Sequence, residues 1–321
     1  MMCGLLKLRL RWFKFRNRFI RAYDEGWLPS VDGHEIHYYQ IGNPKGEPVI
    51  QFHGGPGGSS KVFFACLYNL KKQRIITFDQ RGCGLTRSQD PLYKNTMQDT
   101  VKDAVRLLKY VGVTEKVVVS GGSFGSTLAI LFAETYPERT KRLCVDCIFL
   151  GRPKDLDNMS PVTALFYPDA LDVVETEAKG KVPDVYYGKL LTSNKLSDNE
   201  RAIRYYRRLE RIAGSGDYDV SFPKTEVTDR DIQKFRIFMH YKVNNMFLKS
   251  GQLLKDIGKI AHIPTEIFQN RFDFCCPPNQ AWELHKALPK AKFTLVADEG
   301  HGGDYMRYMI YLGNKKRKYK D

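Results

Sequence analysis

The chain has 321 residues, 42% hydrophobic and 27% charged, and a formal net charge of +15 at pH 7. These proportions are typical of a globular protein, and the length suits one α/β domain with an insertion. No apolar run approaches the roughly 18 residues of a membrane-spanning helix, and no zinc-finger or RNA-binding motif accompanies the positive charge.

Much of the positive charge lies at the two ends of the chain. Residues 1–21 contain seven basic residues and no acidic one, and residues 315–321 are rich in Lys and Arg. Blocks of like charge are usually solvated, so we expect a solvated basic arm and a basic tail. Alternatively the arm contacts an anionic membrane surface through its bases and apolar residues such as Trp12 and Phe15. Because basic residues interrupt the apolar ones, the arm is a poor candidate for a secretory signal.

The seven cysteines are scattered and odd in number, which does not suggest a disulfide scaffold. Cys144 and Cys147 lie in an apolar, strand-like run, where residues three apart point to opposite faces. We therefore expect buried thiols there, no metal site, and a reducing, cytoplasmic location.

Taken in chain order, the sequence first predicts an antiparallel hairpin at a sheet edge, formed by residues 28–31 and 36–40 around Asp32-Gly33. Short β-rich runs then alternate with segments of helical periodicity. The expected strands are residues 49–52, 74–78, 116–120, 142–149, 265–269 and 292–296, and the expected helices are residues 95–111, 126–136 and 279–288. This alternation predicts an α/β fold with a mostly parallel sheet and helices on both faces.

The pattern changes between residues 151 and 254. Strand signals disappear, and Leu, Tyr and Arg recur at helical spacing through residues 199–212 and 229–247. A helical cap at residues 151–254 would lie over the strand ends, where open α/β sheets bind ligands. The expected organisation is a core of residues 22–150 and 255–314, this cap, the arm of residues 1–21 and the tail of residues 315–321.

A G-x-S-x-G sequence centred on Ser123 follows the apolar run of residues 117–119 and precedes a predicted helix. A serine between glycines at a sharp turn from strand to helix is typical of a catalytic nucleophile. Serine also needs a base, and the base needs an acid that orients it. Asp273 and His301 follow later predicted strands in the order that α/β-hydrolases use. Taken singly, Asp273 could instead cap a turn, and His301 could be a loop histidine.

A glycine-rich loop, His53-Gly54-Gly55-Pro56-Gly57-Gly58, directly follows the strand at residues 49–52. Such a loop supplies one backbone donor for an oxyanion, and the residue after the nucleophile supplies the other. We therefore expect an oxyanion hole from the amides of Gly54 and Phe124, with Gly55 beside it. The loop lacks the Gly-Lys-Ser/Thr ending of a phosphate-binding P-loop.

Together these segments resemble the proline iminopeptidases (prolyl aminopeptidases) of the α/β-hydrolase superfamily, from about residue 23 to residue 301. The resemblance rests on the His53 loop, the Asp79-Gln80-Arg81-Gly82-Cys83-Gly84 segment, the Ser123 elbow, Arg271-Phe272-Asp273 with Cys276-Pro277, and Gly300-His301. It implies the α/β-hydrolase fold with a helical cap, Ser123 as nucleophile, Asp273 as orienting acid, His301 as base, and release of N-terminal proline without a cofactor.

The resemblance also implies that cap carboxylates bind the free amino terminus of the substrate. Glu210 retains one family acid, whereas the position of a second family glutamate is, by register, Phe238. We take Glu210, Phe238 and Gly55 as candidate substrate-binding residues. Glu210 could instead be a solvated helix charge paired with neighbouring arginines.

Three functions remain open at this point. The first is a cytoplasmic serine hydrolase of the proline iminopeptidase type, acting on small peptides. The second is a related esterase or amidase whose specificity has changed because Phe238 replaces a carboxylate. The third is a non-catalytic binding or membrane-surface protein.

Overall fold

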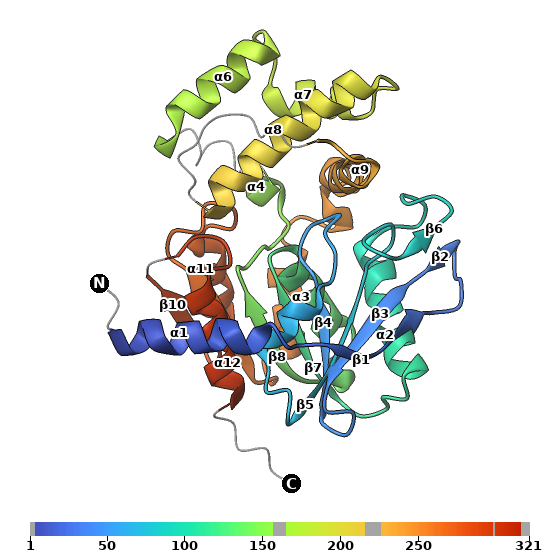
Figure 1. The fold of residues 1–321 in the computed structure, drawn as a ribbon, viewed down its shortest axis with the longest axis vertical. Coiled ribbons are helices and arrows are strands. Elements are labelled where there is room, and N and C mark those ends of the chain that lie inside the picture. The colour runs from blue at the N-terminus through green and yellow to red at the C-terminus, as the bar shows by residue number, and fades with distance from the viewer. Residues whose placement is uncertain (1–3, 157–164, 216–225, 298, 316–321) are drawn as a thin grey trace.

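The computed structural model describes residues 4–156, 165–215, 226–297 and 299–315 (Figure 1). An eight-stranded sheet has the order β1-β3-β5-β4-β7-β8-β9-β10. Its strands are β1 (Ala22–Trp27), β3 (His37–Gly42), β4 (Glu47–Phe52), β5 (Gln73–Phe78), β7 (Val117–Gly122), β8 (Thr140–Asp146), β9 (Thr265–Asn270) and β10 (Lys292–Val296). A separate two-stranded sheet pairs β2 (His34–Glu35) with β6 (Arg87–Ser88).

The sheet is antiparallel only at the β1 edge. The pairs β1–β3 and β3–β5 are antiparallel, and every pair from β5 to β10 is parallel. The carboxyl ends of β4, β7, β9 and β10 therefore lie along one edge of the sheet. The predicted mostly parallel α/β sheet is confirmed, and this edge is where such sheets place their ligands.

Both faces of the sheet are covered, which explains the continuous apolar runs in its central strands. Val117 and Val119 of β7 belong to one buried cluster, and Val118 between them belongs to another. The first cluster includes side chains of α2 (Met97–Tyr110), α3 (Phe124–Thr135), α10 (Gln252–Asp256) and α11 (Pro278–Ala287). The second includes side chains of α1 (Gly4–Asn17), the 3₁₀-helix η1 (Val62–Leu67) and α12 (Asp304–Lys315).

Two strand predictions need correction. The first strand of the edge hairpin is β1, at Ala22–Trp27, whereas residues 28–31 form no strand and contribute the isolated bridge between Val31 and His34 and a hydrogen bond from the Leu28 amide to the Ile36 carbonyl. β8 ends at Asp146, short of the expected residue 149, because Cys147 takes a positive φ of 47° that a strand cannot continue. Cys144 and Cys147 are both buried, as expected.

The basic arm is also different from the expectation, because it folds as α1 and packs on the domain. The Phe13 side chain is 1% exposed and lies against the rings of Tyr308 and Tyr311 in α12. Arg16 donates to the Cys66 carbonyl and stacks on Tyr311. Burial of these apolar and aromatic groups outweighs the repulsion between the arm's like charges. Of the predicted basic tail, only Lys315 is described, as the last residue of α12, and residues 316–321 lie outside the described residues.

The described helices between β8 and α10 form the cap above the sheet (Figure 1). They are α4 (Pro153–Leu156), α6 (Pro168–Ala178), α7 (Pro183–Leu191), α8 (Leu196–Ser215) and α9 (Asp229–Val243), followed by the 3₁₀-helix η3 (Asn245–Phe247). The cap has its own apolar cluster from α7, α8 and α9, in which the Tyr187 and Tyr205 rings stack at 4.0 Å. Among the helices described, none has the length and apolar character needed to cross a bilayer.

The cap contacts the core through α9. The Tyr241 hydroxyl donates to Asn95 Oδ1 at 2.8 Å, and the Tyr241 ring packs edge-on against Phe124, with ring centroids 5.2 Å apart. Phe124 directly follows Ser123. The cap helix is therefore in contact with the turn that carries the candidate nucleophile.

Candidate active site

Ser123 occupies the sharp turn between β7 and α3. Its backbone has φ 56° and ψ −132°, a conformation that a non-glycine residue adopts only under constraint from its surroundings. The Ser126 amide closes the turn by donating to the Ser123 carbonyl, the Ser123 amide donates to the Asp146 carbonyl at the end of β8, and a Cβ on Gly125 would collide with the Phe52 carbonyl. The sequence therefore folds locally as the strained strand-to-helix turn that the G-x-S-x-G pattern predicts.

Asp273 and His301 meet beyond the ends of β9 and β10. His301 Nδ1 lies 2.9 Å from Asp273 Oδ2 and 3.0 Å from Oδ1. Asp273 is 1% exposed, and it also accepts a hydrogen bond from the Cys276 amide at 2.7 Å. This arrangement keeps the Nδ1 proton of His301 on the carboxylate side and leaves Nε2 free to act as a base.

The surroundings of His301 act on its pKa in opposite directions. Burial alone would lower the pKa, but the nearby acidic groups Cys275, Asp273 and Cys147 raise it, and the net result is a pKa well above 6.5. The Asp273 carboxylate thus favours the imidazolium form of His301, which is the form that must be stabilised after the base takes a proton.

Ser123 and His301 lie at the same edge of the sheet, but their side chains are not hydrogen-bonded to each other in the described structure. Among the described residues, no hydrogen bond joins the Ser123 hydroxyl to the His301 ring. The His301 loop is held on its cap side, because the His301 amide donates to the Gly214 carbonyl at 3.0 Å near the end of α8. Catalytic hydrogen bonds are often long without substrate and tighten when it binds.

The glycine-rich loop lies beside Ser123 and is oriented by His53. The position of a Cβ on Gly54 would be 3.4 Å from Ser123 Cβ and 3.8 Å from Oγ. His53 Nε2 accepts from the Gln80 amide at 3.1 Å, so the ring proton is on Nδ1, which donates to the Gly54 carbonyl at 2.7 Å. Burial lowers the pKa of His53 and keeps this tautomer neutral. The ring therefore orients the peptide plane between Gly54 and Gly55.

The segment after β5, residues 79–84, helps to hold the glycine-rich loop in place. Asp79 is 1% exposed, and its carboxylate accepts from the Ser60 amide at 2.7 Å and from the Leu85 amide at 2.8 Å. Burial raises the pKa of Asp79, but the His37 ring, 3.4 Å from Oδ2, and these backbone donors outweigh it and lower the pKa. A Cβ on Gly84 would collide with this carboxylate, so the glycine is needed for the close approach. Sequence reasoning used this segment only as a family motif and missed its supporting role.

On the other side of Ser123, Phe124 is the first residue of α3, so its amide has no acceptor within the helix. The amides of Gly54, Gly55 and Phe124 thus lie on the two backbone segments that flank Ser123. The helix dipole of α3 adds partial positive charge at the same point. The arrangement is suited to stabilising an oxyanion.

Sequence reasoning missed Asp146 at the end of β8. Its carboxylate lies where a Cβ on Gly122 would be, and burial raises its pKa to about 6. Asp146 could have been found from the sequence, because it lies in the strand-like run of residues 142–149, near the point where the strand would end.

The thiols around His301 were also missed. Cys275, Cys276 and His301 offer ligand atoms within 4.8 Å of one another, as do Cys147, Asp273 and His301. Thiolate and imidazole are ligands that Zn²⁺ prefers. These groups could therefore hold a soft divalent ion, and such an ion would occupy the candidate base.

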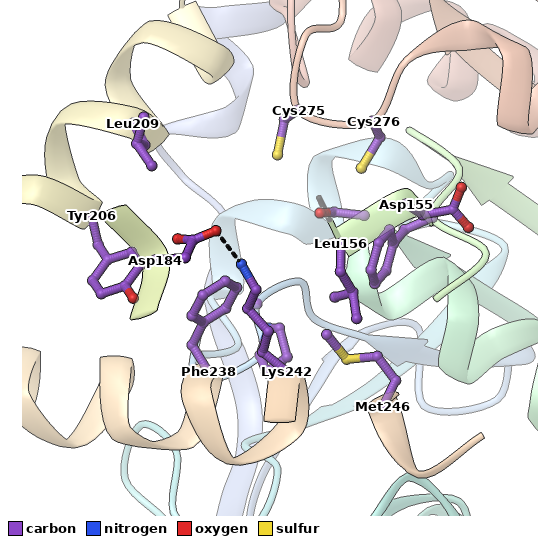
Figure 2. Close-up of a pocket in the computed structure, with 14 residues that line it drawn as sticks. Asp155, Leu156, Asp184, Tyr206, Leu209, Phe238, Lys242, Met246, Cys275 and Cys276 are labelled. Atoms are coloured by element: carbon purple, nitrogen blue, oxygen red, sulfur yellow. Dashed lines mark hydrogen bonds and ion pairs between the residues drawn. The ribbon is translucent and has the colours of Figure 1, made fainter. Parts of the chain in front are cut away.

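A pocket lies between this edge of the sheet and the cap. Ser123, Gly55, Cys275 and Cys276 line it from the core, and the cap contributes Tyr206, Leu209 and Phe238 with the charged pair Asp184 and Lys242 (Figure 2). Phe238 and Gly55 thus lie where the sequence placed candidate substrate-binding residues. Glu210 does not line this pocket; its side chain is 46% exposed and pairs with Lys234 at 2.6 Å.

The similarities to known proteins agree with this geometry. Residues 47–303 match the model of the alpha/beta hydrolase fold family. The chain is 35% identical over 309 residues to a proline iminopeptidase of Arabidopsis thaliana, covering 93% of this chain and 81% of the relative. It is 33% identical over 291 residues to a proline iminopeptidase of Neisseria gonorrhoeae, covering 88% and 91%.

Among solved structures, a proline iminopeptidase-related protein of Thermus thermophilus superposes with a TM-score of 0.59 at 18% identity, over 92% of this chain and 94% of that one. At that identity the superposition supports the fold alone. The family match and the two relatives extend over most of the chain, including the elbow, the acid and the histidine loop. The chain therefore belongs to the α/β-hydrolase fold family and, within it, to the proline iminopeptidases.

Proposed function

We propose that this protein is a serine hydrolase that releases N-terminal proline from small peptides, with Ser123 as nucleophile, His301 as base and Asp273 as its orienting acid. The observation that carries the proposal is the paired Asp273 and His301 at the same sheet edge as the strained Ser123 turn. The relatives that share this chain's length are proline iminopeptidases by name.

The reaction proceeds by two acyl transfers. His301 Nε2 takes the proton of Ser123 Oγ as the oxygen attacks the prolyl carbonyl, and the amides of Gly54 and Phe124 hold the resulting oxyanion. The imidazolium then gives that proton to the leaving amine, and the acyl-enzyme remains. Water, deprotonated by His301, attacks the ester, releasing proline and restoring Ser123. Asp273 stays ionised and stabilises the imidazolium in both steps.

The test is labelling with a fluorophosphonate together with hydrolysis of a prolyl arylamide. We expect one labelled site, absent in Ser123→Ala, and a fall in kcat of several orders of magnitude in that variant. A folded wild-type protein that is not labelled would contradict the catalytic proposal.

A second candidate is hydrolysis of neutral acyl esters or amides. It is favoured by Phe238, an apolar ring in the pocket wall where the family places a glutamate by register. Equal kcat/KM values for a prolyl arylamide and its N-acetyl derivative would support this candidate.

We further propose that the protein acts in a reducing cytoplasm and that α1 touches anionic membrane surfaces. The six described cysteines form no disulfide with one another, which fits the compartment. Leu8, Trp12, Phe15 and Phe19 are each more than half exposed. The first three lie at helical spacing along α1, and the Phe19 ring just after the helix contacts that of Phe15, so they form one apolar stripe bordered by bases. Co-sedimentation with phosphatidylserine vesicles should fall in Trp12→Glu/Phe15→Glu, and equal binding to uncharged vesicles would contradict the proposal.

A further inference from the structure

The pocket beside Ser123 contains an ion pair that the proposed reaction does not use. Asp184 lies in the first turn of α7, and Lys242 lies in the last turn of α9. Lys242 Nζ is 2.6 Å from Asp184 Oδ2, and the two side chains are 15% and 25% exposed. Figure 2 shows the pair reaching across the pocket beside Phe238. The pair therefore sits in a partly desolvated wall of the pocket.

Lys242 follows Phe238 by four residues, so both side chains lie on the same face of α9. That face brings an aromatic ring and a positive charge to the pocket. The negative charge on the cap side of the pocket is Asp184, which belongs to α7 and not to α9. Its other oxygen, Oδ1, accepts a hydrogen bond from the Tyr205 hydroxyl at 3.3 Å, which helps to hold the carboxylate in place.

The other carboxylates near the pocket are held differently. Asp155 is 3% exposed, and Arg152 donates to both of its oxygens, at 2.7 and 2.9 Å. In Figure 2 the Asp155 carboxylate points away from the Asp184–Lys242 pair. Glu210 is outside the lining and is bound by Lys234. Asp184 is thus the lining carboxylate whose cationic partner is a lysine on a flexible stem.

A lysine ammonium can leave such a site at low cost. Its four-carbon stem allows the charged head to move into solvent, whereas a bidentate arginine pair is geometrically fixed. A protonated amine entering the pocket would replace one ammonium by another on Asp184, and the charge balance of the wall would be kept. Binding would require only that Lys242 move away.

We propose that the Asp184 carboxylate receives the protonated amino terminus of the substrate, and that the Lys242 ammonium competes with the substrate for this position. The proposal rests on the proposed function for the identity of the substrate. It makes Asp184 a specificity-determining residue and Lys242 a built-in antagonist of amine binding. Glu210, paired outside the pocket, is then a structural cap charge.

The experiment compares two lysines of α9 that have matched partners. Lys242 and Lys234 each bind a cap carboxylate at 2.6 Å, but only Lys242 lines the pocket. Lys242→Met should lower KM for a prolyl arylamide by on the order of tenfold, because a charge-assisted competitor is removed. Lys234→Met, the matched control, should change this KM by less than about twofold. Asp184→Asn should raise it by on the order of tenfold or more.

The double variant Asp184→Asn/Lys242→Met removes both charges, so a raised KM in that protein cannot come from an unpaired lysine. It should bind amines as poorly as Asp184→Asn. A wild-type KM in Asp184→Asn, or a lowered KM in Lys234→Met alone, would overturn the assignment and point to Glu210 instead.

A second readout separates this inference from the proposed function. L-Prolinamide and its N-acetyl derivative are used as competitors of acetate ester hydrolysis by Ser123. The inhibition constant of prolinamide should follow the same order, lowest in Lys242→Met and highest in Asp184→Asn, while the N-acetyl compound should not discriminate. If the ester is cleaved but no prolyl arylamide is, the proposed function is wrong, and this order of inhibition constants still decides the role of Asp184.

Discussion

On the core side of the pocket, the candidate catalytic side chains are placed by strand ends, whereas on the cap side the charged groups are placed by contacts between helices. Ser123, Asp273 and His301 each follow a strand of one parallel array, so the backbone alone brings them to one edge. Asp184 and Lys242 are 58 residues apart on two helices, and their pairing depends on how those helices pack. In the proposed function, the core edge carries out the chemistry and the cap selects the substrate.

This difference suggests that the two regions respond differently to substitution. A change at the core edge should remove turnover for every substrate, because in the proposed reaction each side chain there serves the acyl transfer itself. A change in the cap should alter the ranking of substrates and leave the hydrolytic step in place.

The largest effect is expected from Asp273→Asn. The variant loses the charge that stabilises imidazolium on His301, so kcat should fall by about 10³ to 10⁴-fold for both amine and neutral substrates. In the wild type the base must be neutral, and since the pKa of His301 is raised, activity should rise with pH through a value above 6.5. Without the carboxylate the pKa of His301 falls, so this acidic limb should move to lower pH.

Asp146→Asn is the matched control for that experiment. Asp146 also follows a strand beside the site, but in the structure the carboxylate bonded to His301 Nδ1 is that of Asp273. We expect a much smaller loss of kcat than in Asp273→Asn. If the two losses were reversed, Asp146 would be the orienting acid, and the order of residues along the chain would have misled the assignment.

The core edge could be predicted from the sequence more easily than the arm and the cap, because strand ends place its residues and helix contacts place theirs. Local sequence patterns predict that Ser123, Asp273 and His301 each follow a strand. Because the strands are parallel, their carboxyl ends lie at one edge of the sheet, so the three residues can be expected near one another. The burial of Phe13 could not be predicted, since its contacts are Tyr308 and Tyr311 at the other end of the chain, and the surrounding bases suggested a solvated arm. The Asp184–Lys242 pair has no local signal either, because neither residue belongs to a motif. Glu210 does belong to one, yet its side chain is turned to Lys234.

A smaller effect, on stability, is expected at Glu134 in α3. This side chain is 5% exposed and neither carboxyl oxygen has a hydrogen-bond partner within the described structure, in contrast to the paired carboxylates of the pocket wall. Burial raises its pKa from 4.5 to about 9. Below pH 4.5 the acid is protonated in both states, and above it only the unfolded chain releases the proton. The folded state therefore loses relative stability as the pH rises toward 9.

Glu134→Gln removes this penalty and keeps the shape of the side chain. The variant should be more stable by up to about 3 kcal/mol at pH 7, with little difference near pH 4, in urea unfolding followed by circular dichroism. Glu138→Gln, at an exposed position shortly after α3, is the control and should show no such trend. A constant difference at all pH values would mean that Glu134 is ionised in the folded protein.

The smallest effect is expected from Phe238→Glu, which restores the acid of the family register. The new carboxylate would lie four residues before Lys242 on the same helix face, where the two would pair. The variant alone should therefore lower KM for a prolyl arylamide by only about twofold, because Lys242 is shared between two acids and neither is fully available.

In a Lys242→Met background the same substitution should lower KM by roughly fivefold, since both carboxylates then face the substrate amine without a resident competitor. Phe238→Gln controls for the loss of the ring, which packs edge-on against Tyr206 with centroids 5.7 Å apart. Equal effects of Phe238→Glu in the two backgrounds would show that Lys242 does not compete for this part of the pocket. If the cap selects substrates and the core performs the reaction, Phe238→Glu should change KM by different factors in the two backgrounds and leave kcat little changed.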